Sequence, residues 1–242
     1  MYSISTTNIT KEYKDTVAVD AVSLDIKDGE LFALLGVNGA GKTTMIKMLS
    51  CLTRPTSGDA TVKGYSVTHE SENVKRLIGV SPQETAVAPN LTVRENLELM
   101  CGLHGFTKEK REKRINELTE QFNLSEILTK KAGKLSGGWQ RRVSIAMALI
   151  SEPSVLFLDE PSLGLDVIAR SELWGLIRSL KGETTVILTT HYMEEAEALS
   201  DRIGIMRDGK LLKVGTAEEL IKISGAYKFE SAFVKIVKGD EV

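Results

Sequence analysis

The sequence is poor in cysteine and has no long apolar run. Its two cysteines, Cys51 and Cys101, stand far apart among apolar neighbours. They form no paired-cysteine zinc motif, and two buried thiols are favoured over a disulfide, which indicates a reducing compartment and hence a cytoplasmic protein. The longest apolar stretches, such as residues 31–35 and 145–150, are much shorter than the roughly 20 residues that cross a bilayer. The first residues also lack the basic and apolar blocks of a signal peptide.

Neither sign of charge dominates. The 242 residues include 31 basic and 33 acidic side chains, for a formal net charge of -2. This balance argues against a nucleic-acid binder held by bulk charge, and the basic residues between 108 and 114 are expected to form a solvated helix face. With 42% hydrophobic and 26% charged residues, the chain is typical of one large soluble domain, or of one core with an inserted lobe.

Hydrophobic periodicity predicts an α/β core interrupted by a helical lobe. Alternation predicts strands in the first thirty residues, and the unbroken apolar run of residues 31–35 is typical of a strand buried on both faces. Helical spacing dominates from about residue 93 to residue 151. The other expected elements are a helix over about 42–52, strands over 155–158 and 185–190 with a helix over 173–180 between them, a hairpin turning at 208–209, and a tail from 216 with a short helix and a weak strand.

A glycine-rich loop follows the expected strand 31–35 and precedes the expected helix. It consists of Gly36, Val37, Asn38, Gly39, Ala40, Gly41, Lys42 and Thr43. Glycines allow a tight turn that aims backbone amides at an anion, at the positive end of the next helix. Lys42 can reach the β- and γ-phosphates of a nucleotide, and the Thr43 hydroxyl suits Mg²⁺. The loop therefore predicts a phosphate site rather than a plain glycine-rich turn.

Two acidic residues, Asp159 and Glu160, follow the expected strand 155–158. Open α/β sheets bind ligands at the carboxyl ends of their strands. Asp159 can hold Mg²⁺ directly or through water, and Glu160 can orient or deprotonate a water, which is typically worth about 10²–10⁴-fold in rate. Two acids after a strand are, taken alone, more often a solvated turn. Together with the phosphate loop they predict a catalytic site.

A second helix start rich in serine and glycine lies in the helical lobe. The run Leu135-Ser136-Gly137-Gly138 directly precedes an expected helix over residues 139–150, and Ser136 is placed like an N-cap. It predicts a second anion site, far along the chain from the first. A simple helix cap is the alternative.

Taken in order, these motifs resemble the nucleotide-binding domain of an ABC transporter over nearly the whole chain. The resemblance is carried by the phosphate loop, Gln83, residues 135–138, residues 156–160, the loop 162–166 and His191. It implies an α/β fold with a P-loop NTPase core and mixed β-sheet, an antiparallel β subdomain and an inserted α-helical subdomain. It further implies a single domain over 1–242, with an ATP-binding core at 1–83 and 153–215, a helical subdomain with the signature motif at 84–152, and a C-terminal tail at 216–242.

The resemblance also implies ATP and Mg²⁺ as cofactors and a role for each matched residue. Glu160, His191 and Gln83 are expected to be catalytic, and Thr43, Gln83 and Asp159 to hold Mg²⁺. Contacts to the nucleotide are expected from Tyr13, Gly36, Val37, Asn38, Gly39, Ala40, Gly41, Lys42, Thr43, Thr44, Ser136, Gly137, Gly138 and Asp166.

Some of these roles are more specific. The resemblance implies that Tyr13 stacks on adenine, and that Ser136 and Gly138 contact the γ-phosphate of the opposite subunit's ATP. It assigns Asp166 to coupling between the two sites. A strand tyrosine or a lone histidine is, without such a resemblance, more often structural.

The signature departs from the family pattern at its fifth position, where Trp139 replaces the usual glutamine. An indole cannot accept a hydrogen bond, but it can pack on a ribose or another aromatic surface. A variation in nucleotide contact is therefore expected, without loss of the phosphate contacts. The run 189–197 resembles the drug-, sodium- and polysaccharide-exporting branch of the family.

The resemblance implies an ATPase subunit that drives a separate membrane permease from the cytoplasmic face. It is expected to form a head-to-tail homodimer around two ATP molecules, or to pair with a homologous subunit, and to bind no nucleic acid. The alternative is a non-transport ABC ATPase that acts as a mechanical switch on a soluble assembly, but the sequence shows one such domain and no heptad run. A signalling GTPase is disfavoured because no Asn/Thr-Lys-x-Asp motif occurs.

Overall fold

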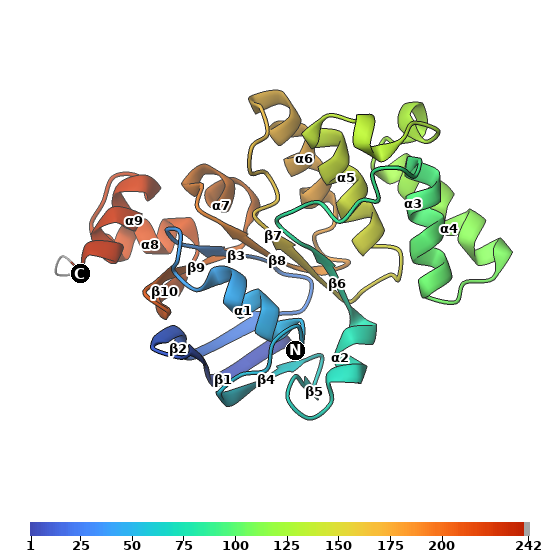
Figure 1. Cartoon of the computed structure of the whole chain (residues 1–242). Coiled ribbons are helices and arrows are strands. Elements are labelled where there is room, and N and C mark those ends of the chain that lie inside the picture. Colours follow the sequence, from blue (N-terminus) through green and yellow to red (C-terminus); the bar gives the residue numbers. More distant parts are fainter. Residues whose placement is uncertain (240–242) are drawn as a thin grey trace.

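A computed structural model describes residues 1–239, which build two β-sheets with helices around them (Figure 1). Within these residues one sheet has six strands in the order β10-β9-β3-β8-β7-β6, and the other has four in the order β2-β1-β4-β5. The strands are β1 (Tyr2–Tyr13), β2 (Thr16–Lys27), β3 (Leu31–Leu35), β4 (Ser57–Val62), β5 (Tyr65–Ser66), β6 (Ile78–Ser81), β7 (Val155–Asp159), β8 (Thr185–Thr190), β9 (Arg202–Arg207) and β10 (Lys210–Gly215).

The helices divide between the two faces of the six-stranded sheet. Helix α1 packs between the two sheets, and α3 to α9 contribute to the core on the other face. The helices are α1 (Lys42–Leu49), α2 (Ser71–Leu77), α3 (Val93–Leu103), α4 (Lys108–Gln121), α5 (Gly137–Ala148), α6 (Val167–Ser179), α7 (Met193–Leu199), α8 (Ala217–Ser224) and α9 (Phe229–Lys238), with short 3-10 turns at Ser125–Ile127 and Ala132–Lys134.

Strand β3 shows why the central strands have unbroken apolar sequences. Leu31, Ala33 and Leu35 belong to the core on the helical face, while Phe32 and Leu34 belong to the core shared with α1 and the four-stranded sheet. All five are fully buried. Because both faces of the strand are covered, the side chains on each face are shielded from water, and the residues on both faces are apolar.

The topology brings three strand ends to one edge of the sheet. Strands β3, β8, β7 and β6 are parallel, so their carboxyl ends meet at the same edge. The glycine-rich loop follows β3, Glu160 follows β7, and His191 follows β8. Strand β8 lies between the other two, so it separates the phosphate loop from the acidic pair by one strand.

The helical lobe lies between β6 and β7 in the chain, as the periodicity predicts. There α3 packs on both α4 and α5, on the side of the molecule away from α8 and α9 (Figure 1). No helix within residues 1–239 has both the length and the apolar character needed to cross a membrane.

Two expectations about smaller features were wrong. The tail contains no weak strand in its described part: α9 occupies that stretch, because Phe229, Phe233 and Ile236 recur at helical spacing and bury one face. Of the two free cysteines, Cys101 is buried as expected, but Cys51 is only partly buried.

Candidate active site

A cavity of about 580 Å³ lies over the glycine-rich loop at the carboxyl edge of the six-stranded sheet. Residues 38–44 of the loop and of α1 line it. Gln83, Glu160 and His191 reach it from the loops after β6, β7 and β8, and residues 16–18 close its other side. Three of the predicted catalytic side chains therefore meet at one cavity, although they come from distant parts of the chain.

The glycine-rich loop depends on glycine for its backbone conformation. Gly41 has a φ of +100°, and a Cβ atom there would come within 2.3 Å of the Ala18 carbonyl oxygen. Gly39 also has a positive φ, of +82°, but faces open space. The loop is therefore held tightly against β2 at Gly41 and left open at Gly39.

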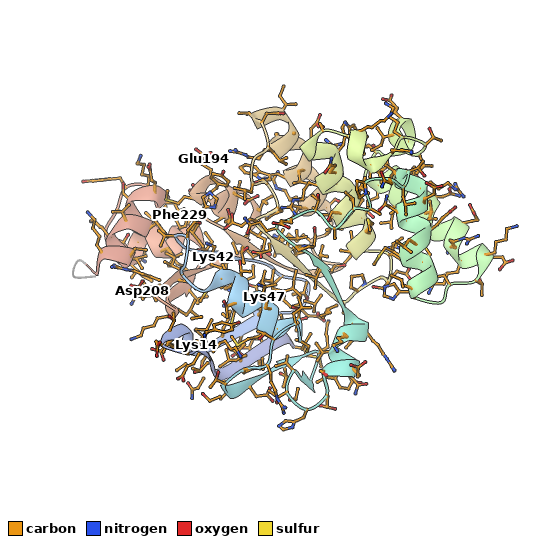
Figure 2. All side chains as sticks on the ribbon, in the orientation of Figure 1. Lys14, Lys42, Lys47, Glu194, Asp208 and Phe229 are labelled. Atoms are coloured by element: carbon orange, nitrogen blue, oxygen red, sulfur yellow. The ribbon has the colours of Figure 1, made fainter. Side chains whose placement is uncertain are left out.

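Lys42, the first residue of α1, is buried at the middle of the site (Figure 2). Its Nζ donates hydrogen bonds to the carbonyl oxygens of Gly36 (2.7 Å) and Val37 (3.3 Å). The same atom lies 3.4 Å from Glu160 Oε1. The ammonium is thus neutralised by the carboxylate and satisfied by its own loop.

Glu160 is buried between the side chains of Lys42 and His191. Besides Lys42, it contacts His191, whose Nδ1 lies 2.7 Å from Glu160 Oε2. Its backbone has a φ of +48°, which costs a non-glycine residue about 1–2 kcal/mol. The Glu160 N–H donates to Thr189 Oγ1 at 3.0 Å and is also 3.2 Å from the Thr189 carbonyl oxygen. Strand β8 therefore helps to hold this unusual conformation.

The residues expected to hold Mg²⁺ fit that ion. The Thr43 hydroxyl donates to Asp159 Oδ1 at 3.1 Å, and the Thr189 hydroxyl donates to the same oxygen. Within residues 1–239, no cluster of three or more His, Cys, Asp and Glu side chains could hold a metal. Thr43 and Asp159 offer a hydroxyl and a carboxylate oxygen, and Mg²⁺ prefers one or two such hard oxygen ligands together with water and substrate phosphates.

The signature segment lies outside this cavity. Ser136 has the backbone of an N-cap for α5, as predicted, but its exposed hydroxyl accepts no capping hydrogen bond. A Cβ atom added at Gly137 would meet nothing within 4 Å. Residues 135–138 do not line the cavity described above. The Ser136 hydroxyl is exposed and has no capping partner, whereas both backbone groups of Leu135 and the Ser136 carbonyl are hydrogen-bonded within the lobe.

Tyr13 and Asp166 do not line the cavity either. Tyr13 is 46% exposed, and Lys11 Nζ lies 5.0 Å from the centre of its ring. Asp166 caps α6, since its Oδ1 accepts a hydrogen bond from the Ala169 N–H at 2.9 Å. Their nucleotide contacts remain predictions. Val17 does line the cavity and is 46% exposed. Sequence reasoning missed this residue, and its only signal was a valine near the start of an expected strand.

Sequence reasoning also missed two buried polar residues that support the site. Thr189 contacts both Asp159 and Glu160, and a threonine at the end of an apolar strand was its only signal. Arg141 is 4% exposed and reaches the backbone of both Gln83 and Glu160. Burial lowers the pKa of Arg141, while the nearby carboxylates of Asp159, Glu195 and Glu160 act in the opposite direction.

Comparison with known proteins identifies close relatives. The family model described as ABC transporter matches residues 19–163. The daunorubicin resistance ATP-binding protein of Streptomyces coeruleorubidus is 42% identical over 221 residues, which cover 91% of this chain and 70% of the relative. A solved ATP-binding subunit of an ABC transporter is 27% identical with a TM-score of 0.85, over 96% of this chain and 98% of that one. A dimeric ATP-binding cassette in a post-hydrolysis state with ADP and Pi is 30% identical with a TM-score of 0.79, over 88% of this chain and 98% of that one.

The daunorubicin and doxorubicin resistance relatives are longer than this chain. The chain spans 66% to 71% of their length. The match covers between 90% and 95% of this chain in each case, so the unmatched length lies almost entirely in the relatives.

Proposed function

The chain belongs to the ABC transporter family of ATP-binding proteins, and from this premise we propose that it binds and hydrolyses ATP to drive export through a separate membrane permease. In this proposal it works at the cytoplasmic face, attached to the membrane through the permease. The observation that carries the proposal is the position of Glu160, 3.4 Å from Lys42 and 2.7 Å from His191 above the phosphate loop.

The Lys42–Glu160 ion pair suggests how the site changes on binding ATP. The γ-phosphate is a stronger partner for the Lys42 ammonium than one carboxylate, because it offers several charged oxygens. Lys42 then turns to the phosphates and releases Glu160, which takes a proton from the attacking water. His191 stays next to Glu160 and contacts the γ-phosphate, and Gln83 orients the water from the opposite wall.

Mg²⁺ in this proposal is held by Thr43 and Asp159, with Gln83 as a further oxygen ligand. When bound, it neutralises charge on the β- and γ-phosphates. Thr189 keeps the Asp159 carboxylate oriented through its hydroxyl hydrogen bond. This arrangement leaves Glu160, the neighbouring carboxylate, available as the base.

The active form is proposed to be a head-to-tail dimer with two ATP molecules at its interface. Supporting this, one chain supplies the phosphate loop and the base, but its Ser136 and Gly138 lie outside its own cavity. The open space beside Gly137 suits a partner's nucleotide. The solved cassette with ADP and Pi is itself dimeric, which supports the same assembly.

Export of a drug-like compound is the proposed direction of transport. The relatives from Streptomyces coeruleorubidus, Mycobacterium tuberculosis and Bacillus subtilis are named for resistance to daunorubicin, doxorubicin and linearmycin. Contacts with the cargo belong to the permease, which is a separate protein in this proposal.

The decisive experiment replaces the base with its amide. Glu160→Gln keeps the size of the side chain but cannot accept the proton, so ATP should still bind while turnover falls by about 10²-fold or more. Glu194→Gln is the matched control, because Glu194 is an exposed carboxylate on α7 that does not line the cavity. Hydrolysis by purified Glu160→Gln at the wild-type rate would contradict the assignment of the base.

The transport role needs a separate test. The tagged wild-type protein is purified from membranes, and its partners are identified by mass spectrometry. Recovery of an integral membrane permease supports the proposal, and deletion of that permease should then release the protein from the membrane fraction. Recovery of ribosomes or of a DNA-repair complex instead would favour a non-transport ATPase.

A further inference from the structure

Arg141 lies where the signature helix, the Gln83 segment and the end of β7 meet. It belongs to α5, which begins directly after Ser136. Its Nη1 donates to the Pro82 carbonyl oxygen at 2.5 Å, and its Nη2 donates to the Gln83 carbonyl oxygen at 2.9 Å. Nη2 also donates to the Glu160 carbonyl oxygen at 2.8 Å. One guanidinium therefore connects three segments that carry different parts of the site.

The contact with Glu160 completes a clamp on the peptide of the base. Glu160 has a φ of +48°, a conformation that persists only where the surroundings enforce it. Its N–H is held by Thr189 of β8, and its carbonyl oxygen is held by Arg141 of α5. The direction of the Glu160 side chain is thus set from both sides of its own backbone.

Only arginine has the donors for this arrangement. The guanidinium is planar and offers five N–H groups in fixed directions, whereas a lysine ammonium acts as a single point charge. Arg141 is 4% exposed, and the carboxylates of Asp159, Glu195 and Glu160 lie near enough to stabilise its charge.

The neighbouring arginine on α5 has a different environment. The Arg142 guanidinium lies 4.5 Å from the centre of the Trp139 ring and forms an ion pair with Glu172. Its hydrogen bond goes to the Glu172 carboxylate, whereas those of Arg141 go to the Gln83 and Glu160 carbonyl oxygens. Arg142 therefore serves as a matched control, since it is also buried on the same helix.

We propose that Arg141 is a positioning residue that links α5, and with it the signature segment 135–138, to the backbone of Glu160 and of Gln83. When the signature segment engages a partner's nucleotide, any shift of α5 is passed through the guanidinium to both carbonyl oxygens. The base and the Gln83 segment then shift together, because one guanidinium holds both of their carbonyl oxygens. This inference rests on the proposed ATPase activity.

The test compares Arg141→Met and Arg141→Lys with Arg142→Lys in the full chain. Both Arg141 variants should lower kcat by about 10- to 100-fold, the loss expected when a catalytic group is misplaced by about 1 Å. The KM for ATP should change by less than about threefold, because no Arg141 atom lines the cavity. ATP binding by equilibrium dialysis and ATP-driven dimerisation by sedimentation, both in a Glu160→Gln background, should also be preserved. Arg142→Lys should retain kcat within about twofold.

Thermal melts decide which variant is informative. If Arg141→Met does not unfold cooperatively, Arg141→Lys decides the test. The lysine keeps the positive charge and loses only the planar array of N–H donors. A kcat within twofold of wild type in a folded Arg141 variant would overturn the inference. So would a parallel loss of ATP binding, dimerisation and kcat, which indicates a general structural role. A wild-type protein without Mg²⁺-dependent ATPase activity would overturn the proposed function itself, and the inference with it.

Discussion

The phosphate loop and the signature segment are both glycine-rich helix starts, but only the first is enclosed by its own chain. A Cβ atom would come within 2.4 Å of the Met206 carbonyl oxygen at Gly36 and within 2.3 Å of the Ala18 carbonyl oxygen at Gly41. At Gly137 it would meet nothing within 4 Å. At Gly138 it would lie 3.1 Å from the Ala169 Cβ. The loop therefore packs against backbone of its own chain at Gly36 and Gly41, whereas the signature segment is open at Gly137 and packed at Gly138.

The same contrast holds for the polar side chains of the two regions. Lys42 is buried, and its ammonium is satisfied by Gly36, Val37 and Glu160. Ser136 is exposed and caps nothing. An exposed hydroxyl costs no desolvation, so the free chain loses little stability by leaving it unpaired. In the proposed dimer we therefore expect the loop to determine the stability and the phosphate site of one chain, and the signature to determine assembly.

Mixing two inactive variants tests this division directly and should give the largest effect. Lys42→Ala removes the phosphate cation and Ser136→Arg puts bulk and charge into the signature, so each homodimer has two damaged sites. A mixed dimer has one site with both lesions and one with neither. Each variant alone should lose about 10²-fold or more of its ATPase rate. Mixing should restore measurable hydrolysis, read as phosphate release, provided that one intact site turns over alone.

The specific activity of the wild type at different protein concentrations tests the shared site without assuming that one intact site turns over alone. A weak dimer should show specific activity that rises with protein concentration. Constant specific activity down to concentrations at which sedimentation finds only monomers, together with no rescue on mixing, would show that each chain has a complete site.

Alanine at the two kinds of glycine should separate stability from assembly. Gly41→Ala combines a φ of +100° with a clash against β2, and should lower the unfolding free energy by about 2–4 kcal/mol. Gly137→Ala has room for its methyl group and should leave that free energy within about 0.5 kcal/mol. It should instead weaken ATP-driven dimerisation. Urea unfolding of the nucleotide-free variants and sedimentation with ATP measure the two effects.

Gly39→Ala controls for the effect of backbone conformation alone. Gly39 has a positive φ, but a Cβ atom added there would meet nothing within 4 Å. Its loss of stability should be smaller than that of Gly41→Ala. Equal losses would mean that the contact with Ala18 is unimportant, and a strongly destabilised Gly137→Ala would blur the distinction between the two regions.

The sequence predicted the order of strands and helices around the site because each motif there is local. Lys42 and Glu160 follow buried strands, so their places at one sheet edge follow from the parallel topology. Arg141 was not predictable in this way. Two adjacent arginines follow Gln140, and periodicity alone does not show which guanidinium reaches the carbonyl of Glu160. The tail was misjudged because the apolar spacing of a short helix also suits a short strand.

Fluorescence of Trp139 should sharpen the assignment of the signature to an interface. Trp139 packs partly against the core, with Arg142 over its ring. In a Glu160→Gln, Trp174→Phe background it is the only tryptophan, since the chain has two. ATP should change its emission if it faces the partner's nucleotide. A flat signal, in a sample shown by sedimentation to be dimeric, would count against that position.

The smallest expected effect concerns Glu195, a buried carboxyl on α7. Its Oε1 accepts a hydrogen bond from Trp174 Nε1 at 3.0 Å. Burial raises the pKa of Glu195 above the usual 4.5. Because the unfolded chain ionises first, the stability that this group contributes is present below pH 4.5 and is lost as the pH rises towards the folded-state pKa.

Glu195→Gln should remove this dependence while keeping an oxygen for Trp174. The unfolding free energy of the variant relative to wild type should therefore increase with pH above 4.5, by about 1 kcal/mol at neutral pH, the scale of one buried polar group. Urea unfolding between about pH 4 and pH 8 measures the difference, with the exposed Glu197→Gln as control. A difference that stays constant across this range would mean that Glu195 ionises alike in both states, and hence that burial does not raise its pKa on folding.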